Sequence, residues 1–173
     1  MSAADAHAAL IRRLFEIGAI RFGEFTLKSG ITSPFYIDLR VVISFPDVLE
    51  QIGALMAAVV GRCGGDRVGG IPYAGLPLAV AASLAGRVPL IYPRREEKGY
   101  GTRKRIEGQF KPGERVVLID DIITDGASKI EAIAPLEEAG LVVRDLVILV
   151  DREQGGRELL AARGYVLHAV LTI

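Results

Sequence analysis

The feature that most limits the fold of this chain is a regular alternation of apolar strands and helices after Pro46. The expected strands at residues 116–119 and 146–150 are apolar at every position rather than at alternate positions. Such strands are typical of a parallel sheet, because its crossover connections place helices over both faces. The pattern predicts an α/β fold with a central, mostly parallel sheet flanked by helices.

The expected elements follow from hydrophobic spacing and from the positions of glycine and proline. Helices are expected at residues 5–17, 47–60, 76–85, 128–139 and 155–162. Strands of the parallel sheet are expected at residues 67–71, 88–92, 115–120, 142–150 and 165–171, with a polar loop at 93–111. Before this core, β-forming residues gather at 19–22, 25–27 and 35–39, which predicts a small N-terminal antiparallel hood.

The chain is expected to form a single domain over residues 1–173, with the hood at about 19–40 and the core at about 46–173. No repeat, low-complexity tract or Pro/Ser-rich linker interrupts it. Its 21 basic and 21 acidic residues balance, which argues against a nucleic-acid partner or an anionic membrane. No stretch reaches the ~18 apolar residues of a membrane helix, and the first ten residues do not resemble a signal peptide, so a soluble protein is expected.

Cysteine and histidine are rare in this sequence. Cys63 is the single cysteine, so no internal disulfide is expected. The two histidines, His7 and His168, add too few ligands for a Cys/His zinc cage. This composition fits a reducing compartment, and a cytoplasmic protein is expected.

The loop after the strand at 115–120 carries the strongest functional pattern. The strand ends in Asp120 and Asp121 and is followed by a short polar turn that opens a helix. Helix N–H groups and the hydroxyls of Thr124 and Ser128 can surround a phosphate, while Gly126 permits close approach of the main chain. Paired carboxylates can accept hydrogen bonds from ribose hydroxyls and lie near a hard cation. The pattern predicts a site for a phosphorylated sugar.

A purely structural interpretation of this loop is a capping box formed by Ser128 and Glu131. Capping does not explain why a buried strand ends in two adjacent carboxylates, one of which is expected to point inward. Two other phosphate motifs, the G-x-x-x-x-G-K-[ST] loop and a G-x-G-x-x-G after a strand, do not occur.

A basic loop follows the strand at 88–92. Residues 94–105, here called the basic loop, hold six basic residues among twelve, in a chain whose charges otherwise balance. A solvated loop or a nucleic-acid patch is the alternative interpretation, although no matching basic face occurs elsewhere. Two glycines fit a lid that closes over a charged substrate, where its cations could neutralise a leaving group in the transition state.

Residues 116–128 resemble the signature of type I phosphoribosyltransferases that binds 5-phosphoribosyl-1-pyrophosphate (PRPP), in which apolar residues precede two acids and a Thr-rich loop. The resemblance implies the type I phosphoribosyltransferase fold. It also implies that Asp120 and Asp121 hold the ribose hydroxyls. The other implied PRPP contacts of this segment are Ile122, Ile123, Thr124, Asp125, Gly126, Ala127 and Ser128.

The basic loop is similar to the catalytic loop of orotate phosphoribosyltransferases, whose pattern is Arg-Lys-Glu-x-Lys-x-His/Tyr-Gly. This chain has Arg95 where the family often has lysine, which keeps the charge but alters the donor geometry. Lys98 takes the place of the catalytic lysine, and Arg94, Arg95 and Tyr100 would contact PRPP. In these enzymes the loop reaches into the site of the neighbouring subunit. The resemblance therefore implies a homodimer.

Residues 22–30 and 33–38 resemble the segment that separates orotate enzymes from purine phosphoribosyltransferases. The resemblance implies that Lys28 contacts PRPP, that Tyr36 and Ile37 line the orotate site, and that Arg152, with Thr124, binds orotate. Without the resemblance, residues 35–37 would be interpreted as strand core, Lys28 as a turn residue and Arg152 as part of a surface ion pair.

Residues 72–77 are the expected pyrophosphate loop, where Tyr73 and Ala74 would contact PRPP and Gly75 lets the main chain approach. Many bacterial members of the orotate phosphoribosyltransferase family carry a lysine at the position of Ala74. This chain therefore lacks that side-chain contact to PRPP.

The resemblance as a whole implies transfer of the ribose 5-phosphate of PRPP to orotate, giving orotidine 5′-monophosphate and pyrophosphate, a step of UMP biosynthesis. The implied cofactor is Mg²⁺, held mainly by PRPP oxygens and water near Asp120 and Asp121. Two alternatives stay open: the same chemistry on a purine or uracil, and a non-catalytic regulator that senses PRPP.

Overall fold

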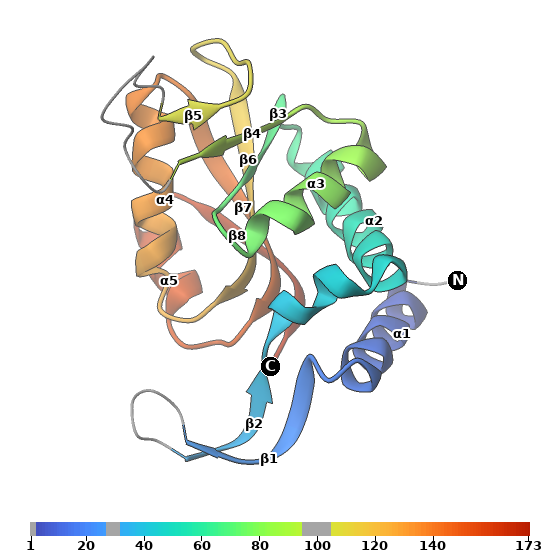
Figure 1. Cartoon of the computed structure of the whole chain (residues 1–173). Coiled ribbons are helices and arrows are strands. Elements are labelled where there is room, and N and C mark those ends of the chain that lie inside the picture. Colours follow the sequence, from blue (N-terminus) through green and yellow to red (C-terminus); the bar gives the residue numbers. More distant parts are fainter. Residues whose placement is uncertain (1–2, 27–31, 95–104) are drawn as a thin grey trace. The chain divides into compact units, whose positions relative to one another are not determined.

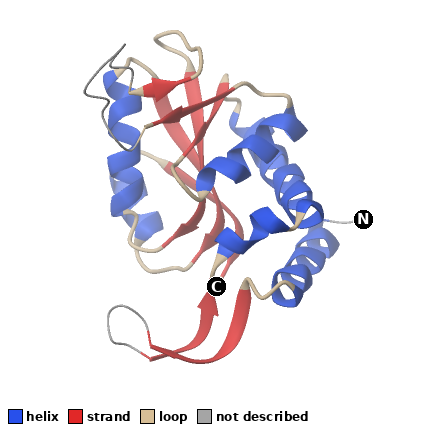
Figure 2. Ribbon diagram, viewed as in Figure 1, coloured by secondary structure: helices blue, strands red, loops and turns tan. Residues whose placement is uncertain are grey.

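The computed structural model describes residues 3–26, 32–94 and 105–173 (Figure 1). The chain divides into two compact units, Met1–Gln51 and Ile52–Ile173. Both units contain helices and strands, which are blue and red in Figure 2. The expectation of a single domain stays a prediction.

The first unit consists of α1 (Ala3–Glu16), β1 (Ile20–Thr26), β2 (Thr32–Ile37), a 3₁₀ helix (Leu39–Ser44) and the beginning of α2 (Pro46–Cys63). β1 and β2 form a two-stranded antiparallel sheet, which confirms the antiparallel pairing expected for this segment. The two short pieces expected at 19–22 and 25–27 are one strand. An irregularity of pairing between Phe22 and Phe25 contains Gly23, so the strand bends there without ending.

The second unit holds the end of α2 and the whole parallel sheet. Its strands are β3 (Arg67–Gly70), β4 (Leu90–Pro93), β5 (Ile106–Glu107), β6 (Arg115–Ile123), β7 (Val142–Asp151) and β8 (Val166–Thr172). They lie in the order β5-β4-β3-β6-β7-β8, parallel except for β5. Its other helices are α3 (Gly75–Gly86), α4 (Ala127–Glu138) and α5 (Gly156–Ala162).

The helices of the second unit cover both faces of this sheet. In Figure 1, α3 lies on one face, and α4 and α5 lie on the other. A buried cluster joins the side chains of Val116 and Leu118 on β6 to those of Ile133 and Leu136 on α4. The α/β fold with a mostly parallel sheet flanked by helices is therefore confirmed.

Two expectations about strands were wrong. The strand expected at 115–120 continues to Ile123, because the longer neighbouring strand β7 pairs with it as far as Ile123 opposite Asp151. The loop expected at 93–111 contains β5, which pairs with β4 through Tyr92 opposite Glu107. Such a short strand has no hydrophobic period of its own in the sequence, so only its pairing defines it.

In the described part of the chain, no helix combines the length and the apolar character that crossing a membrane requires.

Candidate active site

The site lies where the order of the parallel strands changes direction. The chain continues from β3 to β4 on one side of β3, and β6, β7 and β8 are added on its other side. β3 pairs with β6 only as far as Gly70 opposite Ile119, whereas β6 itself runs on to Ile123. Residues 120–123 therefore border the carboxyl-end crevice between β3 and β6, the place where α/β folds bind ligands.

Asp120 is the inward-pointing member of the carboxylate pair. It follows Val116 and Leu118 on the face of β6 that packs against α4, and it is 6% exposed. Its Oδ2 atom lies 2.5 Å from Nζ of Lys129, which is 5% exposed. The expectation that one acid points inward is confirmed, and a buried cation compensates its charge.

Asp121 is less buried than Asp120. Its backbone N–H donates to Oδ1 of Asp120 at 2.9 Å, and its own Oδ1 accepts from the backbone N–H of Ile122 at 2.8 Å. Burial, and secondly the negative charge of Asp120, raise the pKa of Asp121 to about 6. Above that pH its carboxylate is an acceptor suited to sugar hydroxyls.

The raised pKa of Asp121 predicts a pH-dependent cost in stability. Between the ordinary value of 3.8 and about 6, the folded protein retains a proton that the unfolded chain releases. Stability from this group therefore falls as pH rises through that window. We expect the free energy of unfolding of Asp121→Asn, relative to that of the wild type, to rise by on the order of 2 kcal/mol from pH 4 to pH 7. Urea unfolding of both proteins at each pH measures it, and an equal difference at both pH values would contradict the prediction.

Glycines allow the loops of the crevice to pack closely against one another. A Cβ at Gly75, where α3 begins, would lie 2.6 Å from the carbonyl oxygen of Ile119 and 2.8 Å from Oδ1 of Asp120. A Cβ at Gly156, where α5 begins, would lie 2.5 Å from the carbonyl oxygen of Thr124. The expected pyrophosphate loop, whose Pro72–Tyr73 peptide bond is cis, therefore packs directly on the end of β6.

A methyl group at Gly75 should disturb this packing. We expect Gly75→Ala to cost about 1–3 kcal/mol of stability and to weaken PRPP binding, because the backbone of β6 cannot move aside cheaply. Gly61→Ala is the matched control, since Gly61 lies inside α2 with open space around its Cβ position and should gain up to about 1 kcal/mol. Urea unfolding and calorimetric titration with PRPP measure both variants. Equal stability of the two would contradict the close approach.

The capping-box interpretation of Ser128 was wrong. Helix α4 begins at Ala127, and its N-cap is Gly126 in the left-handed conformation, with no side-chain capping bond among the described residues. Oδ1 of Asp125 instead accepts from the backbone N–H of Ala127 at 3.0 Å. Ser128 is exposed in the first turn of the helix, where its hydroxyl can meet a phosphate.

A cavity of about 390 Å³ opens beside these loops. It brings together three predicted PRPP residues from separate segments: Arg94 after β4, Asp120 on β6 and Ser128 on α4. The remaining lining residues come from the same three regions and from the loop after β3: Ile71, Pro72, Pro93, Arg105, Glu131, Ala132, Ala134, Pro135 and Glu138.

The two ends of the basic loop are joined. The backbone N–H of Arg94 donates to the carbonyl oxygen of Arg105 at 2.7 Å, and Nε of Arg94 lies 2.7 Å from Oε1 of Glu107 on β5. The short β4–β5 ribbon therefore anchors the loop at the rim of the cavity. The predicted residues Arg95, Lys98 and Tyr100 lie outside the described residues.

The predicted orotate residues are distributed over both units. Arg152 follows β7, and its backbone N–H donates to the carbonyl oxygen of Ile123 at 3.1 Å, beside the loop that holds Thr124. In the first unit, Tyr36 and Ile37 end β2, with the ring of Tyr36 5.6 Å from that of Phe25. Lys28 lies outside the described residues.

Sequence reasoning missed Lys129. Its side chain lies on the buried face of α4 with Ile133 and Leu136, at positions i, i+4 and i+7. A lysine at a core position of a helix that follows two strand-end acids is a signal for a buried ion pair. Tyr73 and Ala74, by contrast, lie on the loop before α3 as expected, with Tyr73 exposed.

Comparison with known proteins places the chain in one family. Orotate phosphoribosyltransferase from Archaeoglobus fulgidus is 40% identical over 88% of this chain and 86% of its own length. The enzyme of the same name from Thermococcus gammatolerans is 39% identical over 98% and 90%. No protein-family model matches the chain.

Longer relatives match over part of their length. The uridine 5′-monophosphate synthase of Bos taurus is 44% identical over the whole chain, which spans 37% of that relative. The chain thus corresponds to about a third of the length of such proteins.

Solved structures agree with these relatives. Orotate phosphoribosyltransferase from Aeropyrum pernix has a TM-score of 0.83 at 37% identity, over 95% of this chain and 93% of that one. The enzyme from Mycobacterium tuberculosis, solved in complex with PRPP, has a TM-score of 0.79 at 28% identity over 96% of both chains. The fold is that of type I phosphoribosyltransferases, and the chain belongs to the orotate phosphoribosyltransferase family.

Proposed function

We propose that the chain transfers the 5-phosphoribosyl group of PRPP to orotate, giving orotidine 5′-monophosphate and pyrophosphate for pyrimidine biosynthesis. The observation that carries the proposal is the pair Asp120–Asp121 at the carboxyl-end crevice between β3 and β6. The chain that holds this pair is 40% identical to an orotate phosphoribosyltransferase over most of the length of both proteins. The two carboxylates have different surroundings, and this suggests different roles.

In the proposed PRPP site, Asp121 accepts hydrogen bonds from the ribose hydroxyls while Asp120, fixed by Lys129, orients it. The 5′-phosphate lies at the turn of residues 124–128, where backbone N–H groups at the start of α4 and the hydroxyls of Thr124 and Ser128 can donate. The pyrophosphate lies at the loop of Tyr73 and Ala74, and the basic loop supplies its cations.

The donor atoms at the crevice fit Mg²⁺. Carboxylate oxygens are ligands that Mg²⁺ prefers, and it commonly binds through one or two carboxylates together with substrate phosphates and water. Because Asp120 is already paired with Lys129, we propose that Mg²⁺ is held mainly by PRPP oxygens and water, near Asp121. The ion would neutralise charge on the departing pyrophosphate.

Orotate reacts as an anion, so the proposed reaction needs no strong general base. A ring nitrogen of orotate forms the new bond to the anomeric carbon as the bond to pyrophosphate breaks. Arg152, with Tyr36, Ile37 and Thr124, orients orotate, and Lys98 meets the charge that develops on pyrophosphate. The residues Lys28, Arg94, Arg95 and Tyr100 complete the proposed PRPP contacts.

We also propose that the whole chain works as one phosphoribosyltransferase domain in a cytoplasmic homodimer whose basic loops reach the neighbouring sites. The support is the resemblance of residues 94–105 to the catalytic loop of this family and the match of relatives over nearly the whole chain.

The proposal is tested by mixing purified protein with orotate, PRPP and Mg²⁺ and following the loss of orotate absorbance. We expect a loss that requires both PRPP and the metal. A panel of adenine, guanine, hypoxanthine and uracil, with pyrophosphate release as the readout, serves as the control. A flat orotate trace with release from another base would change the substrate, and PRPP binding without turnover on any base would favour a PRPP sensor.

A further inference from the structure

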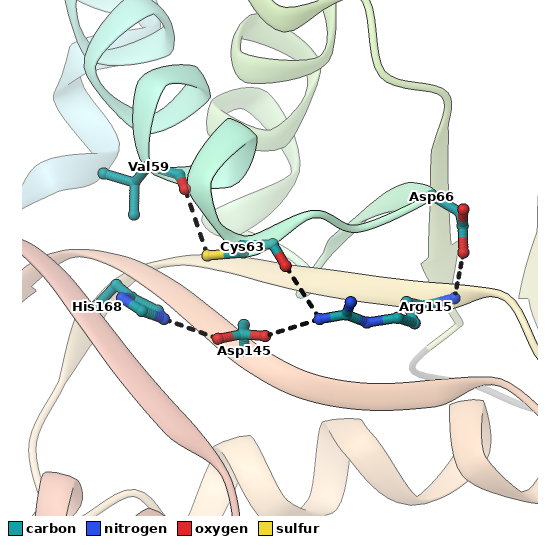
Figure 3. Close-up of polar contacts among 6 residues, drawn as sticks. All are labelled: Val59, Cys63, Asp66, Arg115, Asp145 and His168. Carbon is teal, nitrogen blue, oxygen red and sulfur yellow. Dashed lines mark hydrogen bonds and ion pairs between the residues drawn. The ribbon is translucent and has the colours of Figure 1, made fainter.

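We propose that Cys63, Asp145 and His168 form a binding site for Zn²⁺, separate from the PRPP site. The three residues come from the end of α2, from β7 and from β8. One potential ligand atom from each lies within 4.8 Å of the others, and no other such group of His, Cys, Asp and Glu occurs among the described residues. The close-up in Figure 3 shows the ring of His168 joined to the carboxylate of Asp145, with the sulfur of Cys63 nearby and joined to the carbonyl oxygen of Val59.

A bulge brings Asp145 to this place. The register between β6 and β7 shifts after Val116 opposite Val143, so Val117 lies opposite Asp145 and Arg144 is the extra residue. Side chains alternate along a strand, and the extra residue therefore turns Asp145 to the opposite face from Val143. There it is 8% exposed, next to His168 on β8, which pairs with Val147 two positions further along.

The contacts of the cluster suit a cation. Nε2 of His168 lies 2.8 Å from Oδ1 of Asp145, and the thiol of Cys63 donates to the carbonyl oxygen of Val59 at 3.3 Å. Arg115 lies 3.7 Å from the other carboxylate oxygen and donates to the carbonyl oxygen of Cys63 at 3.0 Å. Arg115 can thus stay paired with Oδ2 of Asp145 and hold the carboxylate in place while Oδ1 binds an ion.

The combination of donors favours zinc over magnesium. Thiolate, imidazole and carboxylate together are typical zinc ligands, and three protein ligands with water in the fourth position are a common zinc arrangement. In a tetrahedral site with bonds of ~2.0–2.3 Å, ligand atoms lie roughly 3.5 Å apart, which small side-chain rotations can reach here. Cys63 and His168 are only half-buried, so an ion has a path of entry.

Binding is a proton exchange. Zn²⁺ would form bonds to Sγ of Cys63, Nε2 of His168 and Oδ1 of Asp145. The thiol proton is released to solvent, and the proton shared by Nε2 and Oδ1 leaves Nε2, so that the bound ring carries its proton on Nδ1. The bound ion would connect the end of α2 to β7 and β8.

The site is distinct from the active site. Asp145 lies opposite Val117, three residues before Asp120 on β6, which is roughly 10 Å along the strand. Val117 and Asp120 also point to opposite faces of the sheet. A zinc ion at Cys63 would therefore not contact Asp120 or Asp121.

The single cysteine makes the test specific to this site. Chelator-treated wild-type protein is alkylated with iodoacetamide in the presence of Zn²⁺ or of Mg²⁺ at equal concentration. We expect Zn²⁺ to slow alkylation of Cys63 at least tenfold, and Mg²⁺ to leave the rate unchanged. Unchanged alkylation in Zn²⁺ would overturn the proposal without any variant having to fold.

Cobalt(II) titration then identifies the ligands. We expect a thiolate-to-cobalt charge-transfer band that saturates at one ion per chain, is lost in Cys63→Ser, and needs at least tenfold more cobalt in His168→Asn. The matched control is His7→Asn, which removes the other histidine of the chain and should titrate as the wild type does. An affinity in His168→Asn equal to that of His7→Asn would exclude His168 as a ligand and refute the site.

Discussion

Replacing Lys98 with alanine is expected to lower turnover by about 100- to 1,000-fold while changing the affinity for PRPP by less than tenfold. The reason is that charge on the pyrophosphate grows as the glycosidic bond breaks, so a cation at the leaving group contributes most in the transition state. Single-turnover kinetics and calorimetric titration with PRPP measure the two quantities separately. Equal losses in turnover and in PRPP affinity would contradict a transition-state role.

Lys111→Ala is the matched control for Lys98→Ala. Lys111 is an exposed lysine beyond β5, outside the proposed site, and its replacement should leave both quantities unchanged.

A mixing experiment tests the proposed exchange of loops between subunits. We expect Asp121→Asn to lose turnover, because Asp121 is proposed to hold the ribose hydroxyls. Subunits that carry Lys98→Ala should then recover part of the turnover when they form mixed dimers with Asp121→Asn subunits, because one site combines an intact loop with intact carboxylates. No recovery in verified mixed dimers would argue against a shared site.

Replacing Lys129 with methionine is expected to cost about 3–5 kcal/mol of the free energy of unfolding. Methionine keeps the length of the side chain but leaves the carboxylate of Asp120, whose side chain is 8% exposed, without its buried cation. A loss of this size corresponds to a fall in Tm of roughly 10 °C for a chain of this length. Urea unfolding at pH 7 gives the free energy directly.

A second substitution separates charge from packing at this pair. In the double variant Lys129→Met with Asp120→Asn, no charge remains buried at the pair, so we expect most of the lost stability to return. Lys111→Met is the control for replacing an exposed lysine, and it should change stability by less than about 0.5 kcal/mol. A double variant as unstable as Lys129→Met alone would mean that the packing of Lys129, and not its charge, stabilises the fold.

The alternation of strands and helices could be predicted because it depends on local periodicity. Apolar runs such as 116–119 and 146–150 have to be buried on both faces, and a parallel sheet is the arrangement that does so. The motif at Asp120 and Asp121 was equally visible, since the two acids, the glycine and the hydroxyl residues of the predicted phosphate loop all lie within residues 120–128. The family followed from the order of such motifs.

The features that depend on pairing between distant segments could not be predicted in the same way. Strand β5 exists only because Ile106 and Glu107 pair with β4, and β6 continues to Ile123 only because β7 is long enough to pair with it. The partner of Asp120 is a lysine nine residues later whose burial depends on how α4 packs. The cap of that helix is Gly126 and not the capping box that the local sequence favours.

By itself, therefore, the sequence determined the class of fold and the family, because both follow from local periodicity and from short motifs in a fixed order. Only the tertiary structure decided which carboxylate is buried, how its charge is compensated and where Cys63, Asp145 and His168 meet. The physical reason is that burial and ion pairing depend on which side chains share a small volume. In this chain a one-residue bulge in β7 places Asp145 beside His168, and the packing of α4 on β6 places Lys129 beside Asp120.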